Sequence, residues 1–297
     1  MIYAINLTIS HEYEVPSGVG RHLVRMLPRA IAGRQRILAA SLTVEPCPAE
    51  RADRTDFFGN HVTSIHHDTP HGFSSLSLNA RIECLMPVPV QDGSPDLKAL
   101  HGLLDGMRQM TGDAPLHCLG PSPRIAENPA IAAYAQQVTA GTDTVLGKVT
   151  ALGAALYRDI AFDPVATTVD SSAAEAFHAR RGVCQDLSHI MITGLRALGI
   201  PAGYVSGFIR TVPPEGMPRL EGADASHAWV RAWCGPGNGW VEYDPTNDTF
   251  VGADHIVIGF GRDYADVSPV KGVHLSAGGQ TSKQQVTVVP LEGETAF

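Results

Sequence analysis

Cysteine is scarce in this chain of 297 residues, and no two cysteines form a CxxC pair. The five cysteines are an odd number in a long chain, which argues against a scaffold of disulfides. The absence of CxxC pairs excludes the common zinc-ribbon arrangement. Because disulfides persist mainly in oxidising compartments, we expect a cytoplasmic protein whose cysteines stay reduced.

Excess positive charge and long apolar runs are missing as well. Lysine and arginine number 22 against 30 aspartates and glutamates, so the net charge is −8. This balance lacks the basic footprint of proteins that bind nucleic acid or anionic membranes. No apolar run reaches the roughly 18 residues that cross a bilayer, and we expect a first strand rather than a signal peptide at the start. Neither nucleic acid nor a membrane is an expected partner.

The composition is otherwise that of a folded protein. Apolar residues make up 44% of the chain and charged residues 18%, which is enough for a sizeable core. At about 150 residues per domain, the length suggests two domains, with one large domain still allowed.

The first 90 residues have the pattern of a β-rich domain. Apolar residues alternate with polar or small ones over the first ten positions, which is the period of a half-buried strand. Further short strands are predicted at 35–44, 59–65 and 74–85. Their spacing favours a small sandwich or an open barrel. The proline-rich segment 86–95 is predicted as a linker, which gives domains 1–90 and 91–297.

The second half has the pattern of helices followed by strands, as in an α+β domain. Helices are predicted at 129–140, 145–160, 171–180 and 184–198. The last of these carries an apolar stripe at helical spacing from Leu187 to Leu198, and Gly199 ends it. Strands are predicted at 203–210, 228–233, 240–244 and 284–289.

Cys184 lies at the start of that last helix, in the sequence RRGVCQD. The positive end of the helix dipole favours a thiolate there, and Arg180 and Arg181 add positive charge. First-turn N–H groups could also stabilise an oxyanion. The alternative is a buried cysteine that serves as a small apolar residue, or an incidental one, as we expect for Cys47, Cys84, Cys118 and Cys234. Cys184 is therefore the candidate nucleophile.

His227 and Asp244 are candidate partners for this cysteine. His227 opens one predicted strand and Asp244 ends the next, although a lone histidine among 13 means little by itself. Their odd separation puts both side chains on one face of an antiparallel hairpin if Trp233 pairs with Asn238 or with Trp240. Asp244 could then orient the imidazole through its Nδ1–H.

The order of these segments resembles the transglutaminase-like superfamily. The resemblance rests on GVCQD, LGIPAGYVSGF, ASHAWV and GWVEYDPTN, and on HEYEVP, LPR, FGNHV and GRDYADVSPVKG, so it covers nearly the whole chain. It is closest to the bacterial transglutaminase-like cysteine protease branch, which has an N-terminal β-rich domain. The resemblance implies a papain-like α+β core in which helices pack on an antiparallel sheet.

The resemblance also implies a triad of Cys184 as nucleophile, His227 as general base and acid, and Asp244 as orienter. The implied chemistry is acyl transfer from a peptide or amide bond through a cysteine thioester. Water as acceptor gives a peptidase or amidase, which is our hypothesis, and an amine gives a crosslinking transglutaminase. A non-catalytic binding module is the third alternative.

The resemblance extends to partners and cofactors. A peptide or protein substrate is the expected partner, and no cofactor or metal is expected. The branch is often associated with amide-forming ATP-grasp proteins, which suggests a role in peptide or amide metabolism.

Two further groups of residues allow more than one interpretation. Trp229, Trp233 and Trp240 surround the predicted hairpin, and we expect at least two of them to pack in the core. Asp186 is expected to anchor the helix start as an anion, with binding of a substrate amine as the alternative.

Two other segments carry hypotheses that the structure can test. Segment 213–224, rich in proline, glycine and charge, is predicted as an exposed loop at the edge of a substrate channel. His66, His67 and His71 are a weak candidate for a metal site, because their only nearby carboxylate is Asp68.

Overall fold

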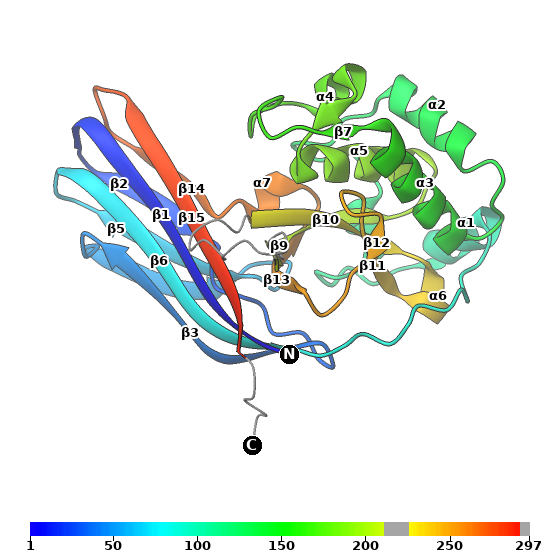
Figure 1. Cartoon of the computed structure of the whole chain (residues 1–297), viewed down its shortest axis with the longest axis horizontal. Helices are drawn as coiled ribbons and strands as arrows, with labels where there is room; N and C mark the ends of the chain where they lie inside the picture. Colours follow the sequence, from blue (N-terminus) through cyan, green and yellow to red (C-terminus); the bar gives the residue numbers. More distant parts are fainter. Residues whose placement is uncertain (211–225, 292–297) are drawn as a thin grey trace, which may run out of the picture.

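The computed structural model describes residues 1–210 and 226–291, which form two lobes (Figure 1). One lobe is a β-sandwich, and the other is a five-stranded sheet with helices packed on it. Residues 85–95 have no regular structure and join the lobes where the sequence predicts a linker. The predicted α+β class is confirmed.

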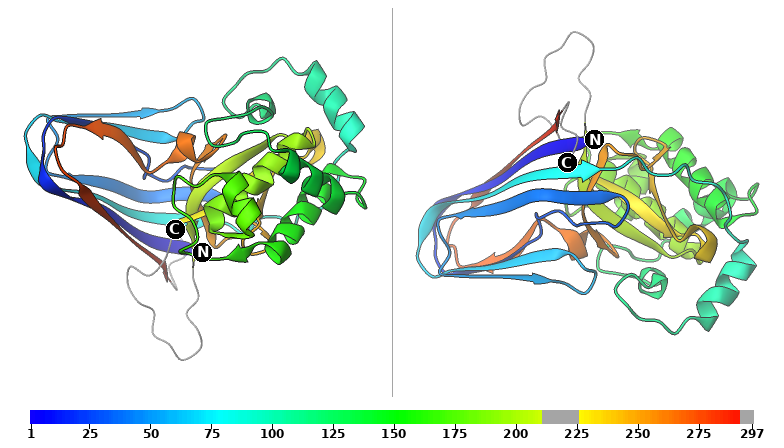
Figure 2. Two further views of the ribbon diagram at one scale, coloured as in Figure 1. Left: turned by 90° about the horizontal axis from the view of Figure 1, so that it is seen from above. Right: turned by 90° about the horizontal axis from the view of Figure 1, so that it is seen from below.

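The sandwich consists of two antiparallel sheets that share one apolar core (Figure 2). The first sheet, in the order β15-β1-β6-β3, comprises β1 (Ile2–Ser17), β3 (Gln35–Glu45), β6 (His71–Cys84) and β15 (Gln280–Leu291). The second sheet, in the order β14-β2-β5-β4, comprises β2 (Gly20–Val24), β4 (Glu50–Thr55), β5 (His61–His67) and β14 (Val270–His274). The alternating apolar residues of β1, such as Ile5 and Leu7, point into this core as their period predicts.

Strands from the C-terminal part of the chain complete the sandwich, which corrects the predicted domain boundaries. β15 pairs with β1 from Ile2 to Tyr13, and β14 pairs with β2. The sandwich is therefore built from both ends of the chain, and 91–297 is not one contiguous catalytic domain. The pattern of a strand shows which of its faces is buried, but it does not specify the sheet that the strand joins.

The second lobe contains the predicted helices and hairpin. Its sheet, in the order β12-β11-β10-β9-β13, comprises β9 (Ala202–Ile209), β10 (Ser226–Trp233), β11 (Trp240–Asp244), β12 (Thr249–Phe250) and β13 (His255–Gly261). The helices are α1 (Leu97–Gly106), η1 (Pro115–Cys118), α2 (Pro129–Val138), α3 (Val145–Asp159), α4 (Ala173–Ala179), α5 (Cys184–Ala197), α6 (Gly235–Asn238) and α7 (Tyr264–Val267). A short parallel pair joins β7 (Ala161–Phe162) and β8 (Arg181–Gly182). Among the described residues, no helix is both long and apolar enough to span a bilayer.

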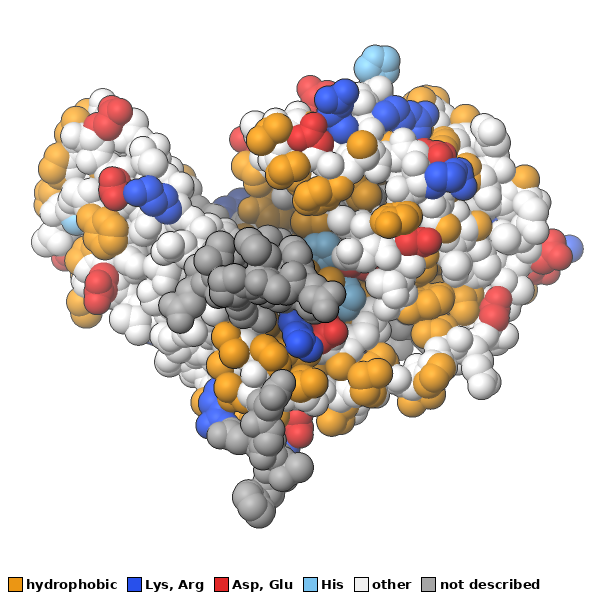
Figure 3. Space-filling view, in the orientation of Figure 1, with side chains coloured by type: hydrophobic (Ala, Val, Ile, Leu, Met, Phe, Trp, Pro, Cys, Tyr) orange, Lys and Arg blue, Asp and Glu red, His pale blue; other side chains and the backbone are white. Residues whose placement is uncertain are grey.

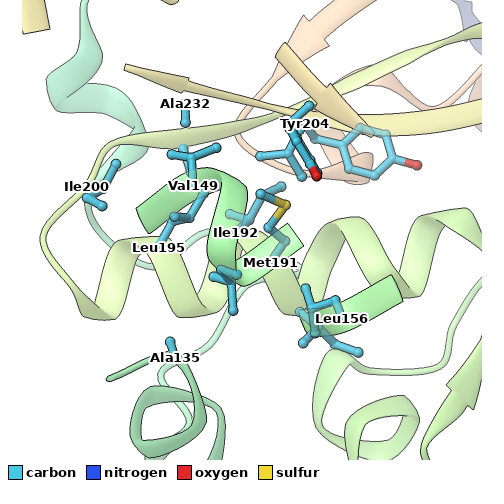
Figure 4. Packing of buried hydrophobic residues seen from close by; sticks show 14 of the residues in the cluster. Ala135, Val149, Leu156, Met191, Ile192, Leu195, Ile200, Tyr204 and Ala232 are labelled. Carbon is cyan, nitrogen blue, oxygen red and sulfur yellow. The ribbon is translucent and has the colours of Figure 1, made fainter. Parts of the chain in front are cut away.

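Helix α5 lies at the centre of this lobe (Figure 4). It contacts α2, α3 and α4 as well as strands β9 and β10. Residues of α5 outside the predicted apolar stripe, such as His189 and Thr193, are buried as well. Gly194 permits this close packing, because a Cβ there would lie 3.1 Å from the Cβ of Ala135. The helix is thus enclosed from several sides rather than packed on one face.

The start of α5 is fixed by local contacts. Asp186 Oδ2 accepts hydrogen bonds from the Val183 N–H at 2.8 Å and from the Thr167 hydroxyl at 2.6 Å. Gly182 leaves room for this carboxylate, because a Cβ there would lie 2.7 Å from Oδ2. These contacts support the anchoring role of Asp186, and they place Cys184 at the first helical position, as predicted.

The two lobes meet along β13, which is an edge of the five-stranded sheet. The side-chain amide of Gln35 accepts from the Val257 N–H at 2.8 Å and donates to the Val257 carbonyl at 2.7 Å. Asn60 forms the same pair of bonds with Phe260, both at 2.8 Å. Apolar side chains of β13 also join the sandwich core. The interface therefore combines a shared apolar core with side-chain amides that pair with the strand.

Candidate active site

His227 and Asp244 lie on the neighbouring antiparallel strands β10 and β11. Trp233 pairs with Trp240, one of the two registers that the sequence analysis considered. This register puts Asp244 opposite Trp229, two residues from His227 and on the same face of the sheet. His227 Nε2 lies 2.7 Å from Asp244 Oδ2, so the two side chains are hydrogen-bonded. The predicted turn between the strands contains the short helix α6.

The ring nitrogen that contacts Asp244 differs from the one expected. The sequence analysis assigned this contact to Nδ1–H, whereas the structure has Nε2. Strand pairing fixes the position of the Cβ atom but not the rotation of the ring, so the sequence could not distinguish the two nitrogens. Because Asp244 occupies Nε2, Nδ1 is the nitrogen left for Cys184, whose side chain lies near enough to contribute to the raised pKa of His227. The structure thus pairs His227 with Asp244 and has Cys184 in their neighbourhood.

Asp244 is completely buried and surrounded by hydrogen-bond donors. Its Oδ2 accepts from His227, from His255 Nε2 at 3.1 Å and from Asn247 Nδ2 at 2.7 Å. Its Oδ1 accepts from the Thr246 N–H at 2.9 Å. A buried carboxylate is stable only when such donors replace water.

These contacts shift the pKa values of the histidine and the carboxylate apart. Burial alone would lower the pKa of His227, but hydrogen bonds to Asp244 and Cys184 outweigh it and raise the pKa to about 10. Burial alone would raise the pKa of Asp244, but hydrogen bonds from His227 and His255 hold it well below its ordinary value. Both shifts favour the charged forms, an imidazolium beside a carboxylate.

Cys184 differs from the other cysteines in its surroundings. It is partly exposed, and it lies near His227, whose pKa it helps to raise. Burial raises the pKa of the Cys84 thiol to about 11 and that of Cys234 to about 12. Burial also raises the pKa of Cys118, and Cys47 is exposed on the sandwich. Cys184 is thus the described cysteine that is both accessible to solvent and near a histidine.

Trp229 lies against the two histidines from the centre of β10. Its ring centroid is 6.0 Å from that of His227 and 5.2 Å from that of His255. Its Nε1–H donates to Glu242 Oε2 at 2.6 Å, and Glu242 pairs with Arg34 from the sandwich side of the chain. The hydrogen bond to Glu242 therefore holds the Trp229 ring against His227 and His255. Trp233 is buried in the core, and Trp240 is partly exposed.

His227, Asp244 and His255 could in principle hold a metal ion, since their ligand atoms lie within 4.8 Å of one another. A histidine that binds a metal through Nε2 carries its proton on Nδ1 and donates it to an acceptor. Nδ1 of His255 instead faces a donor, the Gly252 N–H, at 3.3 Å. If His255 bound a metal through Nε2, its Nδ1–H would point at the Gly252 N–H, so two donors would face each other. The donor set fits a hydrogen-bonded network better than a metal site.

The other predicted metal candidate is not assembled. His66 and His67 are adjacent on β5, so their side chains lie on opposite faces of the sheet. His66 lies 3.8 Å from Glu50 on one side, whereas the ring of His67 lies 4.8 Å from that of His71 on the other. The predicted channel-edge loop, 213–224, lies outside the described residues.

Sequence reasoning missed His255 and Asn247 as members of the site. Asn247 stands three residues after Asp244 in DPTND, which is within reach of a carboxylate that ends a strand. His255 opens the apolar run HIVIGF, the same position that His227 has in its own strand. That shared position at a strand start is the one signal that could have identified it.

One face of the molecule is hollowed between the two lobes (Figure 3). Histidine side chains are visible on the same face. Hydrophobic side chains gather on the same face along the rim. Cys184 is partly exposed, which is consistent with access from solvent.

Two family models match this chain. The model of the transglutaminase-like superfamily matches residues 132–245, and that of the bacterial transglutaminase-like N-terminal region matches residues 3–83. An uncharacterized protein of Mycobacterium tuberculosis is 34% identical over 272 residues, which are 88% of this chain and 84% of that protein. A protein-glutamine gamma-glutamyltransferase of Pseudomonas aeruginosa is 36% identical over 104 residues, which are 32% of this chain and 15% of that protein.

A solved structure shares the fold of both lobes. The crystal structure of a "putative cysteine protease" from Cytophaga hutchinsonii matches with a TM-score of 0.75 at 22% sequence identity, covering 100% of this chain and 92% of that chain. Its likeness supports the predicted fold, a β-rich N-terminal region with a papain-like core. The mycobacterial relative and the two family models together show that this chain belongs to the transglutaminase-like superfamily.

Proposed function

We propose that this protein is a cysteine hydrolase that cleaves a peptide or amide bond through a thioester on Cys184. The observation that carries the proposal is the position of His227, which is hydrogen-bonded to the buried Asp244 and lies near the partly exposed Cys184. This is the nucleophile, base and orienter arrangement of acyl-transfer enzymes.

In the first half of the reaction, the Cys184 sulfur attacks the carbonyl carbon while the proton of the thiol resides on His227. The carbonyl oxygen becomes an oxyanion, and the first-turn N–H groups of α5 are the nearest donors that the helix start provides. The C–N bond then breaks, and His227 gives its proton to the leaving amine. Cys184 is left as a thioester.

In the second half, water attacks the thioester and gives a proton to His227. The C–S bond breaks, the carboxylic acid leaves, and the proton returns to the Cys184–His227 pair. Asp244 stabilises the imidazolium in both halves and remains ionised. An amine in place of water would give a new amide, and the gamma-glutamyltransferase relative of Pseudomonas aeruginosa is the observation that keeps this second function in view.

A small activated ester, p-nitrophenyl acetate, tests the proposal without knowledge of the natural substrate. We expect an acetyl adduct on Cys184, located by peptide mass spectrometry, and turnover that His227→Ala slows about 100- to 10,000-fold. Cys184→Ser should remove the adduct, whereas Cys47→Ser, which changes an exposed cysteine outside the site, should leave it unchanged.

The fate of the acetyl group separates the remaining alternatives. Turnover that continues in buffer alone supports a hydrolase, whereas turnover that requires an added amine such as glycine methyl ester supports a transferase. If the wild-type Cys184 is acetylated no faster than Cys47, the catalytic proposal is wrong and a binding module becomes the better hypothesis.

A further inference from the structure

We infer that His255 is a positioning residue that holds the catalytic carboxylate in place, and that the β-sandwich acts on the active site through it. The inference rests on the proposed function, because it assigns a role relative to Cys184, His227 and Asp244. His255 is 5% exposed, and its side chain contacts Asp244 rather than the nucleophile.

The first observation is that two histidines share one oxygen. Asp244 Oδ2 lies 2.7 Å from His227 Nε2 and 3.1 Å from His255 Nε2, and the two ring centroids are 6.1 Å apart. The oxygen is therefore held between two rings. Without His255, Oδ2 would keep its bonds to His227 and Asn247 but lose the donor that β13 supplies.

The second observation fixes the tautomer of His255. The Gly252 N–H donates to His255 Nδ1 at 3.3 Å, so Nδ1 presents its lone pair. A neutral ring then carries its proton on Nε2, where it can be donated to Asp244. His255 is thus an uncharged donor, whereas His227 shares the carboxylate as the group that exchanges protons with Cys184.

The third observation connects His255 to the sandwich. His255 is the first residue of β13, and the Val257 main chain two residues further is paired with the amide of Gln35. The preceding residue, Asp254, is hydrogen-bonded to the Tyr3 hydroxyl of β1. The sandwich therefore holds the residue before His255 through its side chain and the strand after it through its main chain.

These three observations assign a function to the N-terminal lobe. By fixing β13 it fixes the Nε2–H of His255, and by fixing that donor it fixes the orientation of Asp244. Groups that hydrogen-bond to metal-binding histidines change activity by about 10- to 100-fold when removed, and we expect a loss of the same order for the partner of a catalytic carboxylate. A role of this size is compatible with a residue that does not touch the substrate.

Two substitutions test the role with opposite expectations. His255→Gln keeps an N–H donor at a reach similar to Nε2, whereas His255→Leu has similar bulk and no donor. With p-nitrophenyl acetate, we expect His255→Leu to lower kcat about 10- to 100-fold with KM within about twofold of wild type. We expect His255→Gln to restore kcat to within about threefold of wild type. Equal losses in both variants, or wild-type kcat in His255→Leu, would overturn the inference.

A spectroscopic measurement covers the case in which His255→Leu does not fold. In ¹⁵N-histidine-labelled wild type at neutral pH, the resonance assigned to His255 by its loss in His255→Gln should show the proton on Nε2. A proton on Nδ1 would overturn the inference. The proposed function fails separately, by turnover that survives Cys184→Ser, so the two failures can be told apart.

Discussion

Histidines gather at two places in this protein, and their surroundings differ in one respect. In the helical lobe, His227 and His255 share the carboxylate of Asp244. Between the two sheets of the sandwich, a cavity of about 20 Å³ is lined by four histidines and by no acidic residue: His11, His22, His67 and His71. The ring of His274 stacks against that of His22 at 6.2 Å. We call these five histidines the sandwich cluster.

The pKa values of His22 and His227, one from each group, move in opposite directions. The pKa of His22 is lowered to about 4 by burial and by the nearby His274 and His67, and burial together with His274 also lowers the pKa of His11. His227 is buried as well, yet its pKa is raised to about 10 because Asp244 and Cys184 hydrogen-bond to it. For these two histidines, the difference is the hydrogen-bonded carboxylate of Asp244, which outweighs burial at His227 and has no counterpart at His22.

The test with the largest expected effect removes the carboxylate beside His227. Asp244→Asn leaves His227 buried without a carboxylate, so its pKa should fall from about 10 to below its ordinary value, as in the sandwich cluster. Turnover of p-nitrophenyl acetate should fall about 1,000- to 10,000-fold. ¹⁵N-histidine titration and steady-state kinetics measure both effects. An unchanged pKa of His227 would show that Cys184 alone maintains it.

The pH dependence of stability should separate the two groups. Between pH values of about 6.5 and 4, the unfolded chain binds a proton at His22 that the folded protein does not, so the free energy of unfolding falls as the pH falls, by about 3 kcal/mol at most. Between about 6.5 and 10, the folded protein binds a proton at His227 that the unfolded chain lacks, so stability falls as the pH rises.

Urea unfolding at a series of pH values measures both changes in stability. We call the loss of stability below about pH 6.5 the acid limb and the loss above it the alkaline limb. His22→Gln should reduce the acid limb, to which His189 and His11 also contribute, and keep the alkaline one, whereas His227→Gln should reduce the alkaline limb and keep the acid one. Loss of both limbs in either variant would show that the two groups are not independent.

The smallest expected effect comes from adding an anion to the sandwich cluster. Ser74 lines the same cavity as His22 and is buried, so Ser74→Asp places a carboxylate among the rings. The pKa of His22 should rise by about 1 to 2 units, whereas Ser74→Asn, of equal size and without charge, should leave it near 4. Proton NMR titration of the histidine rings gives both values. Equal shifts in the two variants would attribute the effect to packing.

The local parts of the candidate site could be predicted from the sequence. Cys184 begins its helix because the glycine before it, the carboxylate after it and the apolar stripe act within a few residues. His227 and Asp244 share a face because parity within a hairpin depends only on the turn between the two strands. These features need no knowledge of distant segments.

The distant parts could not be predicted. His255 reaches Asp244 from β13, which is separated from β11 in the sheet by β9 and β10. The return of β14 and β15 to the sandwich depends on pairing with strands more than two hundred residues away. The choice of Nε2 over Nδ1 depends on the rotation of one ring. None of these leaves a periodic mark in a single sequence.

The amides of Gln35 and Asn60 have a consequence for solubility. An edge strand exposes N–H and C=O groups to which a strand of another molecule can add, and this is a common route to aggregation. Along β13 these groups at Val257 and Phe260 are occupied by side chains of the same chain. The sandwich thus prevents strands of other molecules from pairing with β13. A helical lobe produced without the sandwich would have β13 as an unpaired edge, to which other copies of the lobe could add.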